Sequence, residues 1–412
     1  MTTVILGCGI IGASTAYYLS QTQTPSSIHL VEPSPTLFAS ASGNAGGFLA
    51  RDWFSPSLAE LGALSFSEHR RLAEEHNGRD KWGYSRSTGT GYTAASKKTT
   101  SGERGDDWRR EGTSRANAAK KGISELVDDG HGIKWLTRSA GDEIEVISSG
   151  GSTAQVDPLR LSQFLLSECL HRGVQLHHPA TAISVTKDLR DELSSIRILS
   201  TDSATETDIP CTRLLISAGA WSPRVFRTLF PSAGTTLPIT SLAGHSLVIR
   251  SPRWTQEHET AGCHAVFTTD DAGFSPELFS RLGGDIYVAG LNDASLPLPA
   301  LPTDSKIEPD AIAQLQQTAK RLLSLPGEAQ DLDVTRSALC FRPVTDRGTP
   351  ILARFPDATL GPIRTRAGAD GGVFAAAGHG PWGISHSLGT GKVMAEMMQG
   401  LPTSVDIRGL AL

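Results

Sequence analysis

The sequence predicts an α/β fold with two domains, one of alternating strands and helices and a second one built on a mainly antiparallel sheet. The chain has 412 residues, which is too long for one small hydrophobic core. Its beginning has the pattern of strand, glycine-rich loop, helix and strand, with which a βαβ unit starts. Between residues 236 and 290, the strand-like pieces HSLVIR, HAVFTT and DIYVAG favour an antiparallel sheet.

The first elements alternate between strand and helix. Residues 3–6 (TVIL) form a short apolar strand, and after Gly12 the apolar residues take helical spacing. That helix ends at QTQTPSS, and residues 28–32 (IHLVE) are the next strand. Residues 56–76 carry leucines at helical spacing among charged residues, which predicts an amphipathic helix.

The middle of the chain contains a polar excursion and a well-marked helix. From about residue 85 to 122, Ser, Thr, Gly, Lys, Arg and Asp predominate, which predicts a solvated loop or lid. Residues 157–173 predict a helix with Asp157 as N-cap, Pro158 in the first position and Gly173 at the end.

Three further segments complete the expected elements. Residues 213–221 (RLLISAGAW) are a buried strand that runs into a glycine turn, and residues 309–325 have the pattern of another helix. Residues 372–385 (GVFAAAGHGPWGIS) predict a strand, a glycine-rich loop and the start of a last helix.

Composition excludes several classes of protein. The formal net charge is -5 and there is no basic block, so nucleic acid is not expected as a partner. The five cysteines are odd in number and widely spaced, which matches neither a disulfide framework nor a zinc site. We therefore expect no metal and a reducing compartment.

The ends of the sequence and the length of its apolar runs indicate the cellular compartment. The N-terminus enters a predicted strand within three residues, and no apolar run reaches membrane-spanning length. The last residues, RGLAL, are not the peroxisomal tripeptide. We expect a cytoplasmic protein without a membrane span.

The first loop has the spacing of a dinucleotide-binding turn. Gly7, Gly9 and Gly12 form G-x-G-x-x-G between a strand and a helix, and Glu32 follows at the end of the second strand. Glycines at these positions allow a tight turn and a close approach of the backbone to pyrophosphate, and the acid accepts hydrogen bonds from ribose hydroxyls. The alternative is a strand-to-helix turn without a ligand.

A second glycine-rich loop distinguishes FAD from NAD. Residues 39–50 (ASASGNAGGFLA) are crowded with small residues, so their backbone can lie against a flat ring or a diphosphate. A plain nicotinamide-binding domain does not need such a loop directly after the ribose acid. The alternative is a flexible linker.

The order of the motifs resembles a known superfamily. VILGCGIIGASTAYYLS, SGNAGG, LLISAGAWS, CFRPVT and AAGHGPWGIS follow one another as in the FAD-dependent D-amino acid oxidase, glycine oxidase and sarcosine oxidase superfamily. The wording of the second and last motifs is most similar to FAD oxidoreductases of fungi and plants. The resemblance spans nearly the whole chain and departs from the family between about residues 85 and 150.

This resemblance implies a Rossmann-like FAD-binding domain with an inserted α+β substrate domain. The FAD-binding domain is expected in residues 1–76, 151–222 and 336–412, and the substrate domain in residues 77–150 and 223–335. The motifs and the resemblance together give these cofactor-binding candidates: Gly7, Gly9, Ile10, Ile11, Gly12, Glu32, Ser40, Ser42, Gly43, Asn44, Ala45, Gly46, Gly47, Ala182, Ser217, Ala218, Gly219, Trp221, Cys340, Gly378, His379, Gly380, Trp382, Gly383 and Ile384.

Arg342 and His379 are the candidate catalytic residues. In the family, an arginine of the matching R-P pair binds the substrate carboxylate, for which a planar guanidinium fork is well suited. The alternative for Arg342 is a structural ion pair with an acid such as Asp346. His379 is either a polar contact to the flavin or a loop histidine with its hydrogen bonds satisfied.

Cys340 carries a separate question. In the sarcosine oxidase branch, a cysteine at this motif position is bonded covalently to the flavin. The alternative is that Cys340 acts as a small buried hydrophobic residue, and sequence position alone does not favour the covalent bond.

The resemblance implies oxidation of an amino acid or amine. A hydride passes from the carbon beside the amine to FAD, the imine hydrolyses, and molecular oxygen yields hydrogen peroxide. One alternative is a dehydrogenase with another electron acceptor, and another is a flavoprotein with an interaction or trafficking role. His245 and Tyr287 are expected as core or rim residues, and Arg51 and Trp53 reach the pocket floor or merely pack.

Overall fold

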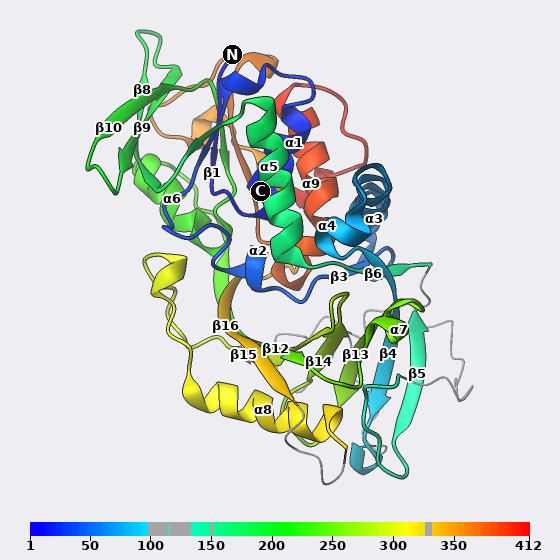
Figure 1. The fold of residues 1–412 in the computed structure, drawn as a ribbon. Coiled ribbons are helices and arrows are strands. Elements are labelled where there is room, and N and C mark those ends of the chain that lie inside the picture. Colours follow the sequence, from blue (N-terminus) through cyan, green and yellow to red (C-terminus); the bar gives the residue numbers. More distant parts are fainter. Residues whose placement is uncertain (98–114, 116–132, 149–150, 326–331) are drawn as a thin grey trace.

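Two large β-sheets organise the chain, and Figure 1 shows one above the other. The computed structural model describes residues 1–97, 115, 133–148, 151–325 and 332–412. The upper part is an α/β domain and the lower part is built on a mainly antiparallel sheet, which confirms the predicted fold class.

The upper sheet has six strands in the order β17-β18-β11-β1-β2-β7. All neighbours are parallel except β17, which pairs antiparallel with β18 at one edge. Residues of β1 and β11 are buried throughout, since both faces of a parallel sheet are covered and its strands are apolar runs. The strands are β1 Thr3–Leu6, β2 Ile28–Val31, β7 Gln175–His177, β11 Arg213–Ile216, β17 Ile351–Arg354 and β18 Gly372–Ala377.

Different layers cover the two faces of this sheet. On one face α1 packs against α5 and α9, and α3 packs against α9 (Figure 1). On the other face, a three-stranded sheet and α6 enclose a second core. These elements are α1 Ile10–Leu19, α3 Pro56–His76, α4 Gly78–Trp82, α5 Pro158–Arg172, α6 Ser222–Leu229, α9 Gly383–Met398, β8 Ala180–Lys187, β9 Leu193–Ser200 and β10 Glu206–Pro210.

Helix α5 forms for the reasons that its sequence indicates. The Asp157 carboxylate accepts a hydrogen bond from the backbone N–H of Arg160 at 3.0 Å, and Pro158 occupies the first helical turn. Gly173 ends the helix with φ of 101°, a left-handed conformation that suits glycine. The predicted cap, first turn and end of this helix are all confirmed.

The lower sheet is long and mainly antiparallel, in the order β16-β12-β15-β14-β13-β4-β6-β3, with β5 beside β4. Helix α8 packs against β12 and β15 and closes an apolar core. The elements are β3 Phe48–Ala50, β4 Ser85–Thr93, β5 Glu143–Ser148, β6 Thr153–Gln155, β12 Thr240–Arg250, α7 Gln256–Glu259, β13 Cys263–Thr269, β14 Glu277–Ser280, β15 Asp285–Asp293, α8 Pro309–Leu323 and β16 Asp333–Val344.

The predicted polar loop from about residue 85 is wrong at its start. Residues 85–93 form β4, which pairs with β6 at Ser85 and Arg86 and with β13 from Ser87 to Thr93. Ser85, Ser87 and Thr90 are buried although the strand is polar, because the backbone ladder holds it in place. Most of the remaining predicted loop, residues 98–114 and 116–122, lies outside the described residues.

No helix in residues 1–97, 133–148, 151–325 or 332–412 is long and apolar enough to cross a membrane.

Candidate active site

One cavity of ≈ 700 Å³ is lined by residues of both domains. It begins at the carboxyl ends of β1, β2 and β11, where open α/β sheets bind ligands, and extends to β14, β15 and β16. The predicted residues that line it are Gly7, Gly9, Ile10, Ile11, Glu32, Ser40, Ser42, Ala45, Gly46, Gly47, Ala182, Ser217, Ala218, Gly219, Trp221, Cys340, Arg342, His379, Gly380, Gly383 and Ile384. Those that lie behind the lining are Gly12, Gly43, Asn44, Gly378 and Trp382.

The turn between β1 and α1 is shaped by its glycines. Gly7 has φ of 97°, and a Cβ there would lie 2.7 Å from the Cα of Ala218. A Cβ at Gly12 would collide with the carbonyl oxygen of Gly7, so glycine permits the close packing of helix on loop. The N-cap of α1, Gly9, offers no side-chain cap, which leaves the start of the helix open to a ligand.

Glu32 supports this turn from the end of β2. Its two carboxylate oxygens accept hydrogen bonds from the backbone N–H groups of Cys8 at 2.9 Å and Ser34 at 3.0 Å. Burial raises the pKa of Glu32, and these backbone hydrogen bonds partly oppose the rise. Each oxygen keeps a second acceptor site, so the carboxylate can also accept from a ligand hydroxyl.

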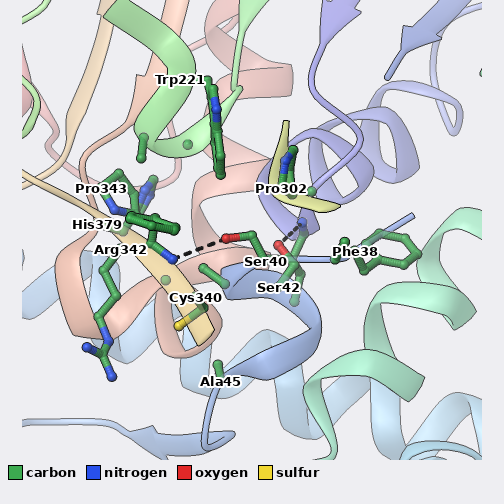
Figure 2. A pocket seen from close by; sticks show the side chains of 18 of the residues that line it. Phe38, Ser40, Ser42, Ala45, Trp221, Pro302, Cys340, Arg342, Pro343 and His379 are labelled. Carbon is green, nitrogen blue, oxygen red and sulfur yellow. Dashed lines mark hydrogen bonds between the residues drawn. The ribbon is translucent and has the colours of Figure 1, made fainter. Parts of the chain in front are cut away.

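The second glycine-rich loop is joined to two other parts of the wall. The Ser42 hydroxyl accepts a hydrogen bond from the backbone N–H of Ile10 at 2.9 Å, and Ser40 accepts one from Phe341 at 3.2 Å. Figure 2 shows both bonds as dashed lines, with Cys340 and Ala45 nearby. The short helix α2 (Ala41–Asn44) carries Ser42, so the loop brings the start of α1 and strand β16 together.

The ends of β11 and β18 complete the wall. The Ser217 hydroxyl hydrogen-bonds the carbonyl oxygens of Leu6 and Gly7, both at 3.2 Å. Trp221 is fixed by a 2.9 Å hydrogen bond from its indole N–H to the carbonyl of Pro299. After β18, Gly380 lies at the cavity, and helix α9 starts at Gly383 without a side-chain cap.

These walls fit a flavin dinucleotide. A Cβ at Gly9 would stand 3.0 Å from the Ser42 hydroxyl and fill the gap between the two glycine-rich loops. The uncapped starts of α1 and α9 both lie at the cavity and favour negative charge there. Glu32 and the first loop would hold the adenosine half, and the second loop with residues 378–384 would hold the flavin half.

Arg342 projects from β16 at the end of the cavity that β14, β15 and β16 line (Figure 2). Its guanidinium donates a hydrogen bond to the side-chain oxygen of Asn292. Among the described residues, no salt bridge joins the Arg342 guanidinium to a carboxylate. Burial acts to lower the pKa of Arg342, but Cys340, Tyr287 and Glu277 nearby outweigh burial and the net shift is upward.

Two other candidates at this end are buried and uncharged. His379 is 4% exposed and its Nε2 lies 3.1 Å from the Thr390 hydroxyl. Burial lowers the pKa of His379 to about 3, so the imidazole is neutral at pH 7. Burial also raises the pKa of the Cys340 thiol, against the opposite influence of Arg342, so thiolate is disfavoured.

Sequence reasoning missed several residues that line this end of the cavity. Arg115 forms a bidentate ion pair with Glu277 at 2.6 and 2.5 Å and lies 5.0 Å from the Trp382 ring. Tyr287, expected as a core or rim residue, lines the cavity beside them, as does Asn292. Single polar residues scattered along the chain form no motif, so the sequence gives no signal for this cluster.

Three other side chains singled out from the sequence lie away from the cavity lining. His245 is buried and accepts a hydrogen bond from the backbone N–H of Glu308 at 3.1 Å. Trp53 packs on Phe48 in an aromatic cluster, and Arg51 is exposed. His245 is therefore a core residue, and Trp53 is a packing residue of the aromatic cluster.

Residues 2–397 match the family described as FAD dependent oxidoreductase, or DAO. The chain belongs to this family. The match covers nearly the whole chain and includes both glycine-rich loops, the β11 turn and the loop before α9. FAD is therefore the cofactor of this oxidoreductase, in agreement with the fit of the cavity walls.

Individual relatives match this chain along nearly their whole length. A Schizosaccharomyces pombe protein named "Putative oxidoreductase" is 26% identical, over 98% of this chain and 96% of its own. The D-amino acid dehydrogenase of Allorhizobium ampelinum is 24% identical, over 100% of this chain and 98% of its own. The first of these agrees with the resemblance to fungal oxidoreductases.

A solved structure shows the same fold. Glycine oxidase from Geobacillus kaustophilus superposes with a TM-score of 0.73 at 19% identity, over 100% of this chain and 97% of that one.

Proposed function

We propose that this chain oxidises the C–N bond of an amino acid, or of a primary or secondary amine, to an imine. Molecular oxygen takes up the two electrons and two protons and leaves as hydrogen peroxide. When bound, FAD accepts the hydride from the carbon beside the amine nitrogen. The observation that carries the proposal is Arg342, a guanidinium in the cavity of a flavoprotein with no carboxylate partner among the described residues.

The surrounding residues suit a carboxylated amine. Asn292 and Tyr287 both hydrogen-bond the Arg342 guanidinium, and the part of its planar fork that they leave open can bind a carboxylate. The neutral His379 imidazole offers hydrogen bonding without charge, so it does not compete with Arg342 for the carboxylate. No group in this set has to remove a proton, because the amine reacts in its neutral form.

The distribution of strands supports the proposed division into domains. All six strands of the upper sheet fall within residues 1–76, 151–222 and 336–412, which we assign to FAD binding. In the lower sheet, strands β4, β5 and β12 to β15 fall within residues 77–150 and 223–335, which we assign to the substrate, whereas the short strands β3 and β6 fall within the ranges assigned to FAD binding. Strand β16 crosses the boundary at 336 and so carries Arg342 from the lower sheet toward the flavin loops.

Substitution of Arg342 tests the carboxylate role. The protein is first mixed anaerobically with a panel of amino acids and amines, and bleaching of the yellow flavin colour identifies a substrate. For a carboxylated substrate, Arg342→Leu should lower kcat/KM by an equivalent of about 2–5 kcal/mol, because a buried charged hydrogen-bond partner is lost. Arg342→Lys should recover part of this loss, since it keeps the charge but not the fork.

An amine of the same shape without a carboxylate is the matched control. Its kcat/KM should not fall in Arg342→Leu. Unchanged turnover of the carboxylated substrate in Arg342→Leu would show that the carboxylate role is wrong. Bleaching by none of the panel would contradict the amine chemistry itself.

The electron acceptor is measured separately. The similarity to a D-amino acid dehydrogenase favours a second candidate, in which electrons pass to a quinone or another protein. One peroxide formed for each substrate consumed in air supports the oxidase. Turnover with an artificial quinone, with little peroxide in air, supports the dehydrogenase.

A further inference from the structure

The second glycine-rich loop is held from outside by side chains of the lower sheet. Four successive carbonyl oxygens, from Gly43 to Gly46, each accept a hydrogen bond from such a side chain. The donors and distances are Arg336 to Gly43 at 3.3 Å, Tyr287 to Asn44 at 3.3 Å, Arg281 to Ala45 at 2.6 Å, and both Gln155 at 2.6 Å and Arg281 at 2.8 Å to Gly46.

Arg281 makes the most contacts in this set. Its Nη2 donates to the carbonyls of both Ala45 and Gly46, and its Nε adds a third hydrogen bond to Gly46 at 3.2 Å. Since one planar guanidinium binds two neighbouring carbonyls, the orientation of both peptide planes is fixed.

The environment of this arginine is unusual. Its exposure is 3%, and no carboxylate of the described residues lies within ion-pair distance. The ring of Tyr287 is 5.0 Å from its guanidinium carbon. Burial lowers the pKa of Arg281, and the nearby Asp157 and Asp285 partly oppose the fall. An arginine guanidinium stays protonated in proteins, so a positive charge without an ion-pair partner among the described residues lies behind the loop.

The other side of the same peptides faces the cavity. In a trans peptide the N–H points opposite to the carbonyl, so carbonyls turned toward Arg281 direct the N–H groups of Gly46 and Gly47 the other way. Ala45, Gly46 and Gly47 line the cavity. Within the described part of the chain, no acceptor binds the N–H of any of these three.

Glycine is needed for this arrangement. A Cβ at Gly46 would lie 2.6 Å from the Phe279 ring, and Gly47 has φ of 85°. The loop is therefore pressed against the lower sheet while its N–H groups stay open to a ligand.

We propose that Arg281 is a positioning residue for the flavin: it directs the Gly46 and Gly47 N–H groups toward the cofactor and adds a positive charge behind them. Both effects stabilise added electron density, so Arg281 makes the bound flavin easier to reduce. The inference rests on the proposed assignment of this loop to the flavin, but not on the proposed substrate.

The test is the midpoint potential of the bound flavin, measured by anaerobic titration against a reference dye without any amine. In Arg281→Met, the equilibrium constant for two-electron reduction should fall at least tenfold, which is about 30 mV toward more negative potential. In Arg281→Lys, which keeps the charge but not the fork, the shift should be smaller.

Arg213→Met is the matched control. Arg213 is also 3% exposed and has no ion pair with any residue that the structure describes, but it binds the carbonyl of Met398 at 3.0 Å and the Gln23 side chain at 2.7 Å, away from the cavity lining. Its loss should leave the potential unchanged. A wild-type potential in Arg281→Met, or an equal shift in Arg213→Met, would overturn the inference.

If Arg281→Met does not fold, Arg281→Gln takes its place, since it keeps a hydrogen-bond donor without the charge. A negative shift in Arg281→Gln larger than that in Arg281→Lys supports the inference, and a potential equal to that of the wild type contradicts it. A protein that binds FAD but bleaches with no amine still gives these potentials, so failure of the proposed substrate chemistry is recognised separately.

Discussion

At the scale of single residues, the CFRPVT motif places two chemically different groups on the same strand. Cys340 and Arg342 both line the cavity, but only the arginine has a charge and free hydrogen-bonding capacity there. The Cys340 thiol is 2% exposed, and burial raises its pKa. A bond to the flavin would require the thiolate, which this environment disfavours.

Acid precipitation distinguishes bound from covalent flavin. We expect the yellow colour to pass into the supernatant, because Cys340 stays a thiol, and Cys340→Ser should retain FAD as the wild type does. The measurement is the flavin absorbance of pellet and supernatant. Colour that stays in the wild-type pellet but leaves the Cys340→Ser pellet would demonstrate a covalent bond.

At the scale of elements, sequence patterns predicted those segments whose structure is decided locally. Helix α5 carries its own cap, proline and terminal glycine, and it begins and ends where the sequence indicates. Strand β4 is the opposite case, since SRSTGTGYT has no apolar pattern and is held by pairing with β13, which is distant in sequence.

The same distinction applies to the candidate site. The glycines of the two glycine-rich loops could be predicted from the sequence, because their spacing follows from the local turn. Arg342 could be predicted because it lies within a motif. Arg115, Glu277 and Asn292 come to line the same cavity only after folding, from three separate segments. Arg281 was likewise invisible, because its partners are backbone carbonyls more than 200 residues away in the sequence.

Strand β12 needs a glycine at the position that lies beside the Arg342 guanidinium. Gly244 pairs with Cys340 on β16, and a Cβ at Gly244 would collide with the Arg342 guanidinium. We expect Gly244→Ala to displace the guanidinium and to raise KM for a carboxylated substrate at least tenfold, with FAD content unchanged. Steady-state kinetics and the flavin absorbance of the purified protein measure this.

Gly91→Ala is the control for a glycine within a strand of the same sheet. A Cβ there would meet the Ile147 side chain at 3.8 Å, an ordinary contact, so KM should stay as in the wild type. An equal effect of both substitutions would mean that strand distortion, and not Arg342, limits substrate binding.

At the scale of the whole molecule, three buried histidines join the helical layer to the cavity wall. His69 lies on α3 and bonds the carbonyl of Ile384 at 3.0 Å, while the rings of His379 and His386 are 6.5 Å apart. His386 is fully buried, and neither ring nitrogen has a partner among the described residues. Each of the three is neutral in the folded chain for the same reason, the cost of burying charge.

This cluster makes the stability of the fold depend on pH. Burial lowers the pKa to about 4 for His69 and to about 3 for His379 and His386, whereas an unfolded histidine titrates near 6.5. Below pH 6.5 the unfolded chain therefore binds protons that the folded chain does not. The free energy of unfolding is highest above this pH and falls as the pH decreases toward 4.

Replacement of His386 isolates the contribution of one histidine. Its ring lies 4.3 Å from that of Phe54, so phenylalanine can keep the aromatic contact without a titrating group. Between pH 7 and pH 5.5, the free energy of unfolding of His386→Phe should fall by about 1 kcal/mol less than that of the wild type. Urea unfolding followed by tryptophan fluorescence at the two pH values gives both differences. Equal falls would mean that His386 is already protonated in the folded chain, and that the cluster does not couple the fold to pH in this range.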